Sequence, residues 1–309
     1  MKTDKKYRLV TRSDFDGLVC AVLLKELDLI DDILFVHPKD MQDGKIAITG
    51  SDITTNLPYV EGVYLAFDHH ESETVRISTK YDNHIIEKDA PSAARVVYSY
   101  YGGEAAFPEV SKEIMEAVDK GDSAKFTQDE VMSPSGWNLL NFIMDARTGL
   151  GRFKDFRISN YQLMMELISL CKQMTIEEIL KTPDVKERVD LYFRYEDKFK
   201  DQLQRCSTLF GNVVVLDLRY EEMIYPGNRF VIYALYPQAN ISVHEIWGVN
   251  RQNTVFAVGK SIFNKTSAVN IGEVMLRYGG GGHAAAGTCQ VSNANADKSR
   301  AELVKLLNG

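Results

Sequence analysis

The segment Tyr7–Leu27 reads YRLVTRSDFDGLVCAVLLKEL, and its order of residue types predicts an α/β fold. A short β-rich run at Tyr7–Thr11 comes first, and Gly17–Leu27 then has the apolar spacing of a helix. Two carboxylates, Asp14 and Asp16, lie between the two. A strand that passes through acidic residues into a helix is the first unit of an alternating β–α chain.

The alternation continues through the first half of the chain. Further strands are expected at Ile33–His37, Lys45–Gly50 and Gly62–Phe67, and further helices at Ser92–Tyr101, Val110–Val118 and Trp137–Met144. The strand segments are densely apolar rather than alternating, which is typical of strands covered on both faces. The sequence therefore predicts a doubly wound, mostly parallel sheet over residues 1–185.

The second half has a different character. Lys186–Gln204 has the pattern of one long polar helix, so residues 186–210 are expected to form a helical linker. Strands are expected at Val213–Leu218, Phe230–Tyr236, Ile241–Val249 and Thr254–Val258, and helices at Ile271–Tyr278 and Asp297–Leu307. These elements predict a second, smaller α/β domain over residues 211–309.

The composition excludes several classes of protein. The chain is 45% hydrophobic and 26% charged, which argues against disorder. The net charge of −7 makes duplex binding driven by overall charge unfavourable. Four well-separated cysteines without a CxxC pair, no apolar signal segment and no membrane-length apolar run lead us to expect a cytoplasmic protein.

Acidic residues follow several expected strands. Asp14 and Asp16 follow the first strand, Asp52 follows Lys45–Gly50, and Asp68 with His69 and His70 follows Gly62–Phe67; a further acid, Asp119, lies close to Asp122. The carboxyl ends of parallel strands line a common crevice, so these groups are expected to converge. Carboxylates with imidazole and no thiolate suit Mn²⁺ or Mg²⁺. Each acid taken alone is as typical of a turn or a helix cap.

A glycine-rich stretch near the end of the chain, Gly279–Gly287, reads GGGGHAAAG. Glycines allow backbone N–H groups to approach an anion closely, and His283 adds a donor. A flexible linker is the alternative, but an apolar helix precedes the stretch and its last glycine opens the strand-like run GTCQV. A bend that binds a phosphate is the better interpretation.

Together, SDFDG, GSDIT, DHH, AVDKGDS and GGGGHAAAG resemble, in order and over nearly the whole chain, the DHH phosphoesterases that carry the first type of DHH-associated C-terminal domain. That family includes RecJ exonucleases, NrnA-type nanoRNases and phosphoadenosine-phosphate phosphatases, and cyclic dinucleotide phosphodiesterases. The resemblance implies a two-metal phosphoesterase whose active site lies between its two domains.

The resemblance also implies roles for individual residues. The implied metal ligands are Asp14, Asp16, Asp52 (bridging two ions), His69 and Asp119. Asp68 would orient a ligand, and His70 would face the substrate phosphate. The implied substrate-binding residues are Gly280, Gly281, Gly282, His283, Lys260, Arg277 and Arg12, with His283 also counted as catalytic. The implied cofactors are two ions of Mn²⁺, or of Mg²⁺ or Co²⁺.

This sequence departs from the family pattern at the first motif. Many members have a histidine four residues before the first aspartate, where this chain has Val10, and others have one two residues before it, where this chain has Arg12. One metal site therefore lacks a nitrogen ligand, and Arg12 offers a positive charge instead. Lys260 stands where many relatives have arginine, which keeps the charge but loses the bidentate fork.

These observations predict hydrolysis of a phosphodiester or phosphomonoester in a small nucleotide. Short oligonucleotides are the first candidate substrate, with phosphoadenosine phosphate or dinucleotides next. Two alternatives stay open: a polyphosphate or pyrophosphate hydrolase, which GGGGH disfavours, and a weakened nucleotide sensor, which Val10 motivates. No membrane or duplex partner is expected, and a homodimer is left open.

Overall fold

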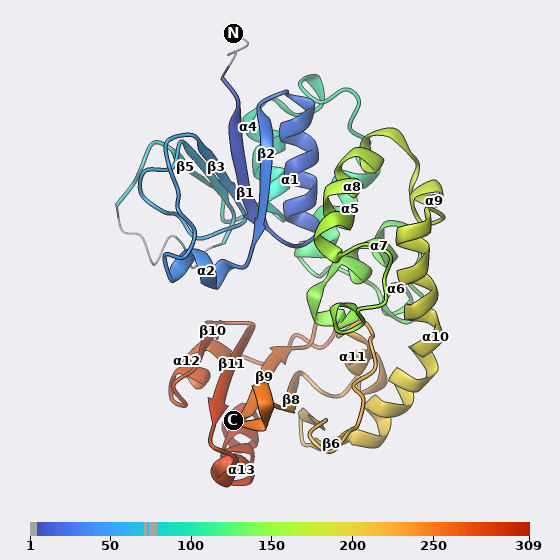
Figure 1. Cartoon of the computed structure of the whole chain (residues 1–309). Helices are drawn as coiled ribbons and strands as arrows, with labels where there is room; N and C mark the ends of the chain where they lie inside the picture. Colours follow the sequence, from blue (N-terminus) through green and yellow to red (C-terminus); the bar gives the residue numbers. More distant parts are fainter. Residues whose placement is uncertain (1–4, 71–72, 74–78) are drawn as a thin grey trace. The chain divides into compact units, whose positions relative to one another are not determined.

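The computed structural model describes residues 5–70, 73 and 79–309. The chain divides into two compact units (Figure 1). Unit 1 comprises Met1–Lys125, Ser135–Ala146 and Leu150–Asp190, and unit 2 comprises Phe126–Pro134, Arg147–Gly149 and Leu191–Gly309. In the described part of the chain, no helix combines the length and the apolar character needed to span a lipid bilayer.

Unit 1 is built on a five-stranded sheet in the order β2-β1-β3-β4-β5. The strands are β1 (Tyr7–Arg12), β2 (Ile30–Val36), β3 (Asp52–Thr55), β4 (Leu65–Asp68) and β5 (His84–Ile86). All four pairings are parallel, which confirms the predicted sheet type. The chain moves to one side of β1 to form β2 and to the other side to form β3, so the strand order reverses at β1. Ligands of such sheets bind where this reversal occurs, at the carboxyl ends of the strands.

Helices of unit 1 connect and cover these strands. They are α1 (Phe15–Glu26), α2 (Pro38–Gln42), α4 (Ala93–Tyr100), α5 (Lys112–Asp122), α7 (Gly136–Met144), α8 (Asn160–Gln173) and α9 (Ile176–Ile179). Helix α1 is almost entirely buried and lies against α4, α5 and α8. Its start is fixed by Asp14, whose side chain accepts a hydrogen bond from the Gly17 amide. Helix α10 (Pro183–Cys206) begins in unit 1 and ends in unit 2.

Unit 2 contains a six-stranded mixed sheet in the order β10-β11-β9-β8-β7-β6. Its strands are β6 (Ser207–Phe210), β7 (Val213–Asp217), β8 (Ile241–Trp247), β9 (Thr254–Lys260), β10 (Gly281–His283) and β11 (Ala286–Val291). Its helices are α6 (Gln128–Met132), α11 (Val231–Leu235), α12 (Ile271–Leu276) and α13 (Ala296–Leu307). Among the described strands of this sheet, only β7 and β8 pair in parallel. One face of this sheet packs with α12 and α13 around a core that includes Val243, Phe256 and Leu303.

Two of the expected strands are wrong. Lys45–Gly50 has no strand: Ile46 and Ile48 pack against a core that contains Val10 and Val36, but their backbone does not join the sheet. Phe230–Tyr236 is not a strand either, because Val231–Leu235 forms helix α11. A short apolar run signals burial in both cases, and burial alone does not distinguish a strand from a short helix or a packed loop.

Candidate active site

The carboxyl ends of β1, β3 and β4 lie side by side in unit 1. Asp14 follows β1, Asn56 follows β3, and Asp68 ends β4 before His69 and His70. The register pairs Thr55 with Phe67, and the Asn56 amide donates to the Phe67 carbonyl at 3.0 Å. Polar groups from segments far apart in the sequence are thereby brought to one edge of the sheet.

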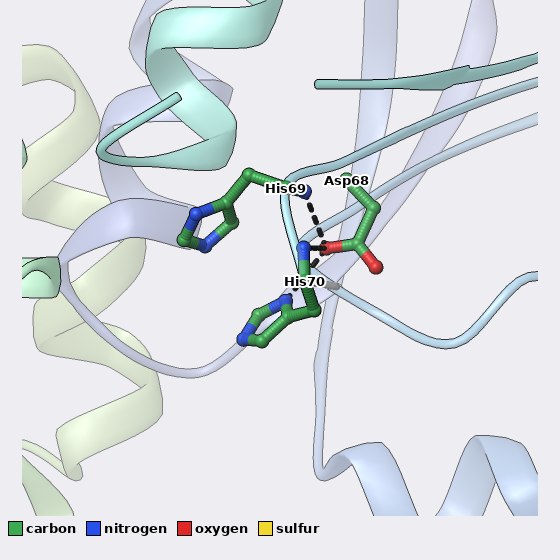
Figure 2. Close-up of side chains that lie close together, drawn as sticks. All are labelled: Asp68, His69 and His70. Carbon is green, nitrogen blue, oxygen red and sulfur yellow. Dashed lines mark hydrogen bonds and ion pairs between the residues drawn. The ribbon is translucent and has the colours of Figure 1, made fainter. Parts of the chain in front are cut away.

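Asp68 is fully buried and holds both histidines (Figure 2). Its Oδ1 accepts hydrogen bonds from the His69 amide at 2.8 Å and from His70 Nδ1 at 2.7 Å. Its Oδ2 points away from these contacts in Figure 2 and has no hydrogen-bond partner among the described residues. Burial alone would lower the pKa of His70, but the hydrogen bond and charge of Asp68 raise it above the ordinary value.

His69 is oriented by a different contact. Its Nδ1 lies 3.1 Å from the Ala90 carbonyl oxygen, so this nitrogen carries a proton and Nε2 faces the other way. Nε2 lies 2.9 Å from Oδ2 of Asp122. Burial would lower the pKa of His69, but the hydrogen bond and charge of Asp122 outweigh it and raise the pKa to about 9.

Asp16 lies in the same cluster, on the first turn of α1. It is buried, and its two oxygens accept hydrogen bonds from the amides of Ala93 and Ala94 at 2.9 and 2.8 Å, at the start of α4. Its pKa is nevertheless raised, first by burial and then by the nearby charges of Asp122 and Asp14. Carboxylates that repel one another in this way favour a bound cation.

Asp16, His69 and Asp122 each offer a ligand atom, and these atoms lie within 4.8 Å of one another. The set combines two carboxylates and one imidazole, which suits a hard or borderline divalent cation. The repulsion between the carboxylates at Asp16 fits the same conclusion. The residues present are therefore compatible with a divalent metal.

Asp119, which the sequence suggested as a ligand, lies outside this cluster. Its carboxylate accepts from Arg95 Nε at 2.9 Å and from the Ser92 hydroxyl at 2.7 Å. Ser92 caps α4, so Asp119 fixes the start of the helix that holds Asp16. Asp122, one turn later on α5, faces His69 instead. These contacts favour Asp122 over Asp119 as the ligand, since the position of α5 along its axis decides which of the two acids reaches His69.

Asp52 was expected to follow a strand, but it is the first residue of β3. Its register partner is Arg8, near the start of β1, so Asp52 lies at the edge of the sheet opposite the cluster. Arg8 Nε donates to Asp52 Oδ1 at 2.7 Å, and the Thr49 amide donates to Oδ2 at 2.6 Å. These contacts make Asp52 a structural residue. A bridging role for it is incompatible with this position.

Asp14 is surrounded by donors. Arg12 Nε lies 2.8 Å from its Oδ2, and its Oδ1 accepts from the Gly17 amide at 3.0 Å and from Asn56 Nδ2 at 3.3 Å. Val10, in the middle of β1, is completely buried in an apolar core and has no atom that ligates a metal. Both observations are consistent with the expectation that the metal site on this side of the cluster lacks a nitrogen ligand.

In unit 2, the glycine-rich stretch forms a β-hairpin rather than a simple bend. Gly281–His283 is strand β10, which pairs with β11 so that Gly282 is opposite Gly287. A Cβ atom on Gly280 would lie 2.1 Å from the Thr288 oxygen, and one on Gly282 would lie 2.3 Å from the Ala286 oxygen. These two glycines are therefore required by packing. A Cβ atom on Gly281 would meet nothing within 4 Å.

The other expected substrate-binding residues of unit 2 surround this hairpin. Lys260 ends β9, its amide donates to the Ala285 carbonyl at 2.9 Å, and its Nζ donates to the Ser267 carbonyl at 3.2 Å. Arg277 is exposed and caps the end of α12. His283 is exposed at the end of β10, and its Nδ1 accepts from the Ala285 amide at 3.2 Å. Lys260 and His283 thus border the same hairpin turn.

The sequence did not assign a role to Asn56 or to Asp122. Asp122 had a signal, since it is three residues from Asp119 on the same helix. The sequence signal for Asn56 was weaker, because the strand before it was expected at Lys45–Gly50. That strand lies instead at Asp52–Thr55, directly before Asn56. Residues 136–153, whose role the sequence left open, include α7, whose Leu139, Leu140 and Phe142 are buried.

Comparison with solved structures gives a match over nearly the full length. The pGpG-specific phosphodiesterase PggH from Vibrio cholerae is 63% identical, with a TM-score of 0.86 and coverage of 98% of this chain and 99% of that chain. RecJ from Thermus thermophilus, in complex with Mg²⁺, is 14% identical, with a TM-score of 0.49 and coverage of 97% of this chain and 49% of that chain. No protein-family model and no curated protein matches the chain.

Proposed function

The chain belongs to the DHH family of phosphoesterases and hydrolyses phosphoester bonds of small nucleotides, and from this premise we propose that its substrate is a linear dinucleotide of the pGpG type. The observation that carries the proposal is the 63% identity to PggH over 98% of this chain. Water would add across the bond between the bridging phosphorus and the 3′ oxygen. The products would be two nucleoside 5′-monophosphates.

Asp16, His69 and Asp122 would hold the divalent cation, for which Mn²⁺ is the best candidate. Mn²⁺ accepts both carboxylate and imidazole ligands, whereas Mg²⁺ prefers oxygen alone. A bound divalent cation supplies activation of water and neutralisation of phosphate charge. His69 fits the ligand role because its Nδ1 is engaged by Ala90 and its Nε2 faces Asp16 and Asp122.

His70 would act on the substrate directly. Asp68 holds its Nδ1 at 2.7 Å, so Nε2 is the nitrogen left to donate to a phosphate oxygen. The His70 side chain is 38% exposed, whereas the Asp68 side chain is 1% exposed. His70 can therefore contact the substrate, and Asp68 positions His70. The raised pKa of His70 favours the protonated, donating form.

Residues of unit 2 would bind another part of the substrate. The space beside Gly281 allows an anion to approach the backbone of the hairpin, and His283, Lys260 and Arg277 offer donors around it. On this proposal residues 1–185 form the catalytic domain, 186–210 the linker and 211–309 the substrate-binding domain.

The test is a substrate panel with the full chain and Mn²⁺: pGpG, pApA, phosphoadenosine phosphate and tripolyphosphate, with products separated by ion-exchange chromatography. We expect GMP from pGpG, with kcat/KM at least about tenfold above that of the other compounds, which corresponds to about 1.4 kcal/mol. Asp122→Asn, purified identically, controls for contaminating nucleases. Tight binding of pGpG without turnover in Mn²⁺, Mg²⁺ or Co²⁺ would instead identify a sensor, and preference for tripolyphosphate would identify a polyphosphate hydrolase.

A further inference from the structure

Asp14 differs from the other acids of the cluster because an arginine side chain engages it. Arg12 Nε lies 2.8 Å from Asp14 Oδ2, and both groups come from the end of β1. The other oxygen, Oδ1, accepts hydrogen bonds from the Gly17 amide and from Asn56 Nδ2. Asp14 is also absent from the groups of described residues whose ligand atoms converge closely enough to hold a metal ion.

Asn56 contributes to this arrangement without adding charge. It is 1% exposed, at the end of β3 and directly beside the end of β4. Its Nδ2 faces the Asp14 carboxylate, and because a carboxylate only accepts hydrogen bonds, this contact fixes the orientation of the amide. A carboxylate at this position would be repelled by Asp14 unless a cation lay between them. The amide instead stabilises Asp14 without a cation between them.

We propose that the site holds a single divalent cation, on Asp16, His69 and Asp122, and that the guanidinium of Arg12, fixed on Asp14 with the help of Asn56, takes the place of a second cation. The charges support this arrangement. The three carboxylates of Asp14, Asp16 and Asp122 are balanced by one divalent cation and one guanidinium, with His69 ligating as the neutral imidazole. The fourth carboxylate, Asp68, is paired with His70. A second divalent cation on Asp14 would lie close to the Arg12 charge and would have to displace it.

This inference rests on the proposed function only in taking the cluster to be the metal site, and it replaces the expected pair of ions with one. Arg12 becomes a positioning and charge-supplying residue. A phosphate group that enters beside the cation would find a guanidinium in the place of a second ion, and a planar guanidinium suits a phosphate oxygen pair.

The test measures metal stoichiometry directly, by calorimetric titration of the full, metal-free chain with Mn²⁺ and by the electron paramagnetic resonance spectrum of the bound Mn²⁺. We expect one tight Mn²⁺ per chain, with the spectrum of an isolated ion. In the double variant Arg12→Gln, Asn56→Asp, a second Mn²⁺ should bind at least about tenfold more tightly than any second ion in the unmodified chain, with a spectrum showing coupling between two ions.

Arg8→Gln is the matched control, because Arg8 also lies on β1 and pairs with an aspartate, but at the opposite edge of the sheet. It should keep one Mn²⁺ per chain, and thermal unfolding of each variant checks that the chain is folded. Two tight, coupled ions in the unmodified chain would overturn the inference, as would a folded double variant that still binds one. Hydrolysis of pGpG is measured in parallel. If the unmodified chain binds two ions and hydrolyses pGpG, only the inference of a single ion is contradicted. If it binds one ion and does not hydrolyse pGpG, only the proposed function is contradicted.

Discussion

His69 Nε2 lies 2.9 Å from Asp122 Oδ2, and this contact joins the end of β4 to the end of α5. It places an imidazole and a carboxylate beside the buried Asp16, and no neighbouring pair in the sequence indicates it. The raised pKa of His69, about 9, shows that a positive charge is favoured here when Asp122 is ionised. A divalent cation would satisfy the same demand.

This relationship predicts a sharp contrast between two acids on α5. Asp122→Asn should weaken Mn²⁺ binding at least about tenfold and reduce hydrolysis at least about a hundredfold, because it removes a ligand. Asp119→Asn should retain Mn²⁺ affinity and reduce hydrolysis less than about tenfold, because Asp119 contacts Arg95 and Ser92 instead. Calorimetry and steady-state kinetics of both variants give the comparison. The reverse ranking would show that Asp119 is the ligand.

Asp52→Asn should affect stability rather than activity. The change leaves Arg8 without its carboxylate partner and removes charge-assisted hydrogen bonds to the buried Asp52. We expect a loss of about 1–3 kcal/mol in the free energy of unfolding of unit 1, measured in urea. Mn²⁺ affinity should be unchanged below the unfolding transition. A folded Asp52→Asn protein that no longer binds Mn²⁺ would restore Asp52 to the metal site.

The hairpin of unit 2 allows two adjacent glycines to be compared. Gly282→Ala should destabilise unit 2. Gly282 has a φ of 157°, and an added Cβ atom would lie 2.3 Å from the Ala286 oxygen, which leaves no room for a methyl group. Gly281→Ala has open space and should leave the melting temperature within about 2 °C of the original. If an anion approaches the backbone here, Gly281→Ala should raise KM several-fold, by about 1 kcal/mol, with kcat less affected. An unchanged KM would remove Gly281 from the substrate-binding residues.

The stability of unit 2 should fall in acid because of His244 on β8. Burial lowers the pKa of His244 to about 4, and the charge of Arg229 acts in the same direction. A group whose pKa is lower in the folded state than its unfolded value of about 6.5 takes up protons preferentially on unfolding. Its contribution is therefore complete above about pH 6.5 and is lost as the pH falls towards 4, by at most about 3 kcal/mol.

Urea unfolding at about pH 7 and about pH 5, on either side of the unfolded pKa, tests this, with His244→Gln as the comparison. Trp247 lies in unit 2 and Trp137 in unit 1, and they are the two tryptophans of the chain, so a Trp137→Phe background makes fluorescence report on unit 2. The acid-induced loss should be smaller in the His244→Gln protein. Equal losses in both proteins would assign the acid sensitivity to other groups.

Much of the site could be predicted because strand ends in a parallel sheet have a common location. Asp14, Asp16, Asp68, His69 and His70 follow strong apolar runs, so their convergence followed from the fold class. The expected place of Asp52 after a strand was wrong for a local reason. Ile46 and Ile48 made the preceding loop resemble a strand, which shifted the expected strand end. Asp119 and Asp122 lie on the same face of α5, one turn apart, and the sequence does not set which turn of the helix lies beside His69.

The sequence alone determined the class of fold and the chemical inventory of the site, because the alternation of apolar segments and the residue types at their ends are local properties of the chain. Tertiary structure alone decided which acids lie close enough together to bind one cation. The packing of α1 and α4 on the parallel sheet, and of α5 against both helices, brings ligand atoms of Asp16, His69 and Asp122 within 4.8 Å of one another and leaves Asp14 to Arg12. The reason is electrostatic: interactions between charges depend on ångström-scale distance and on burial, and neither is written in the spacing of residues along the chain.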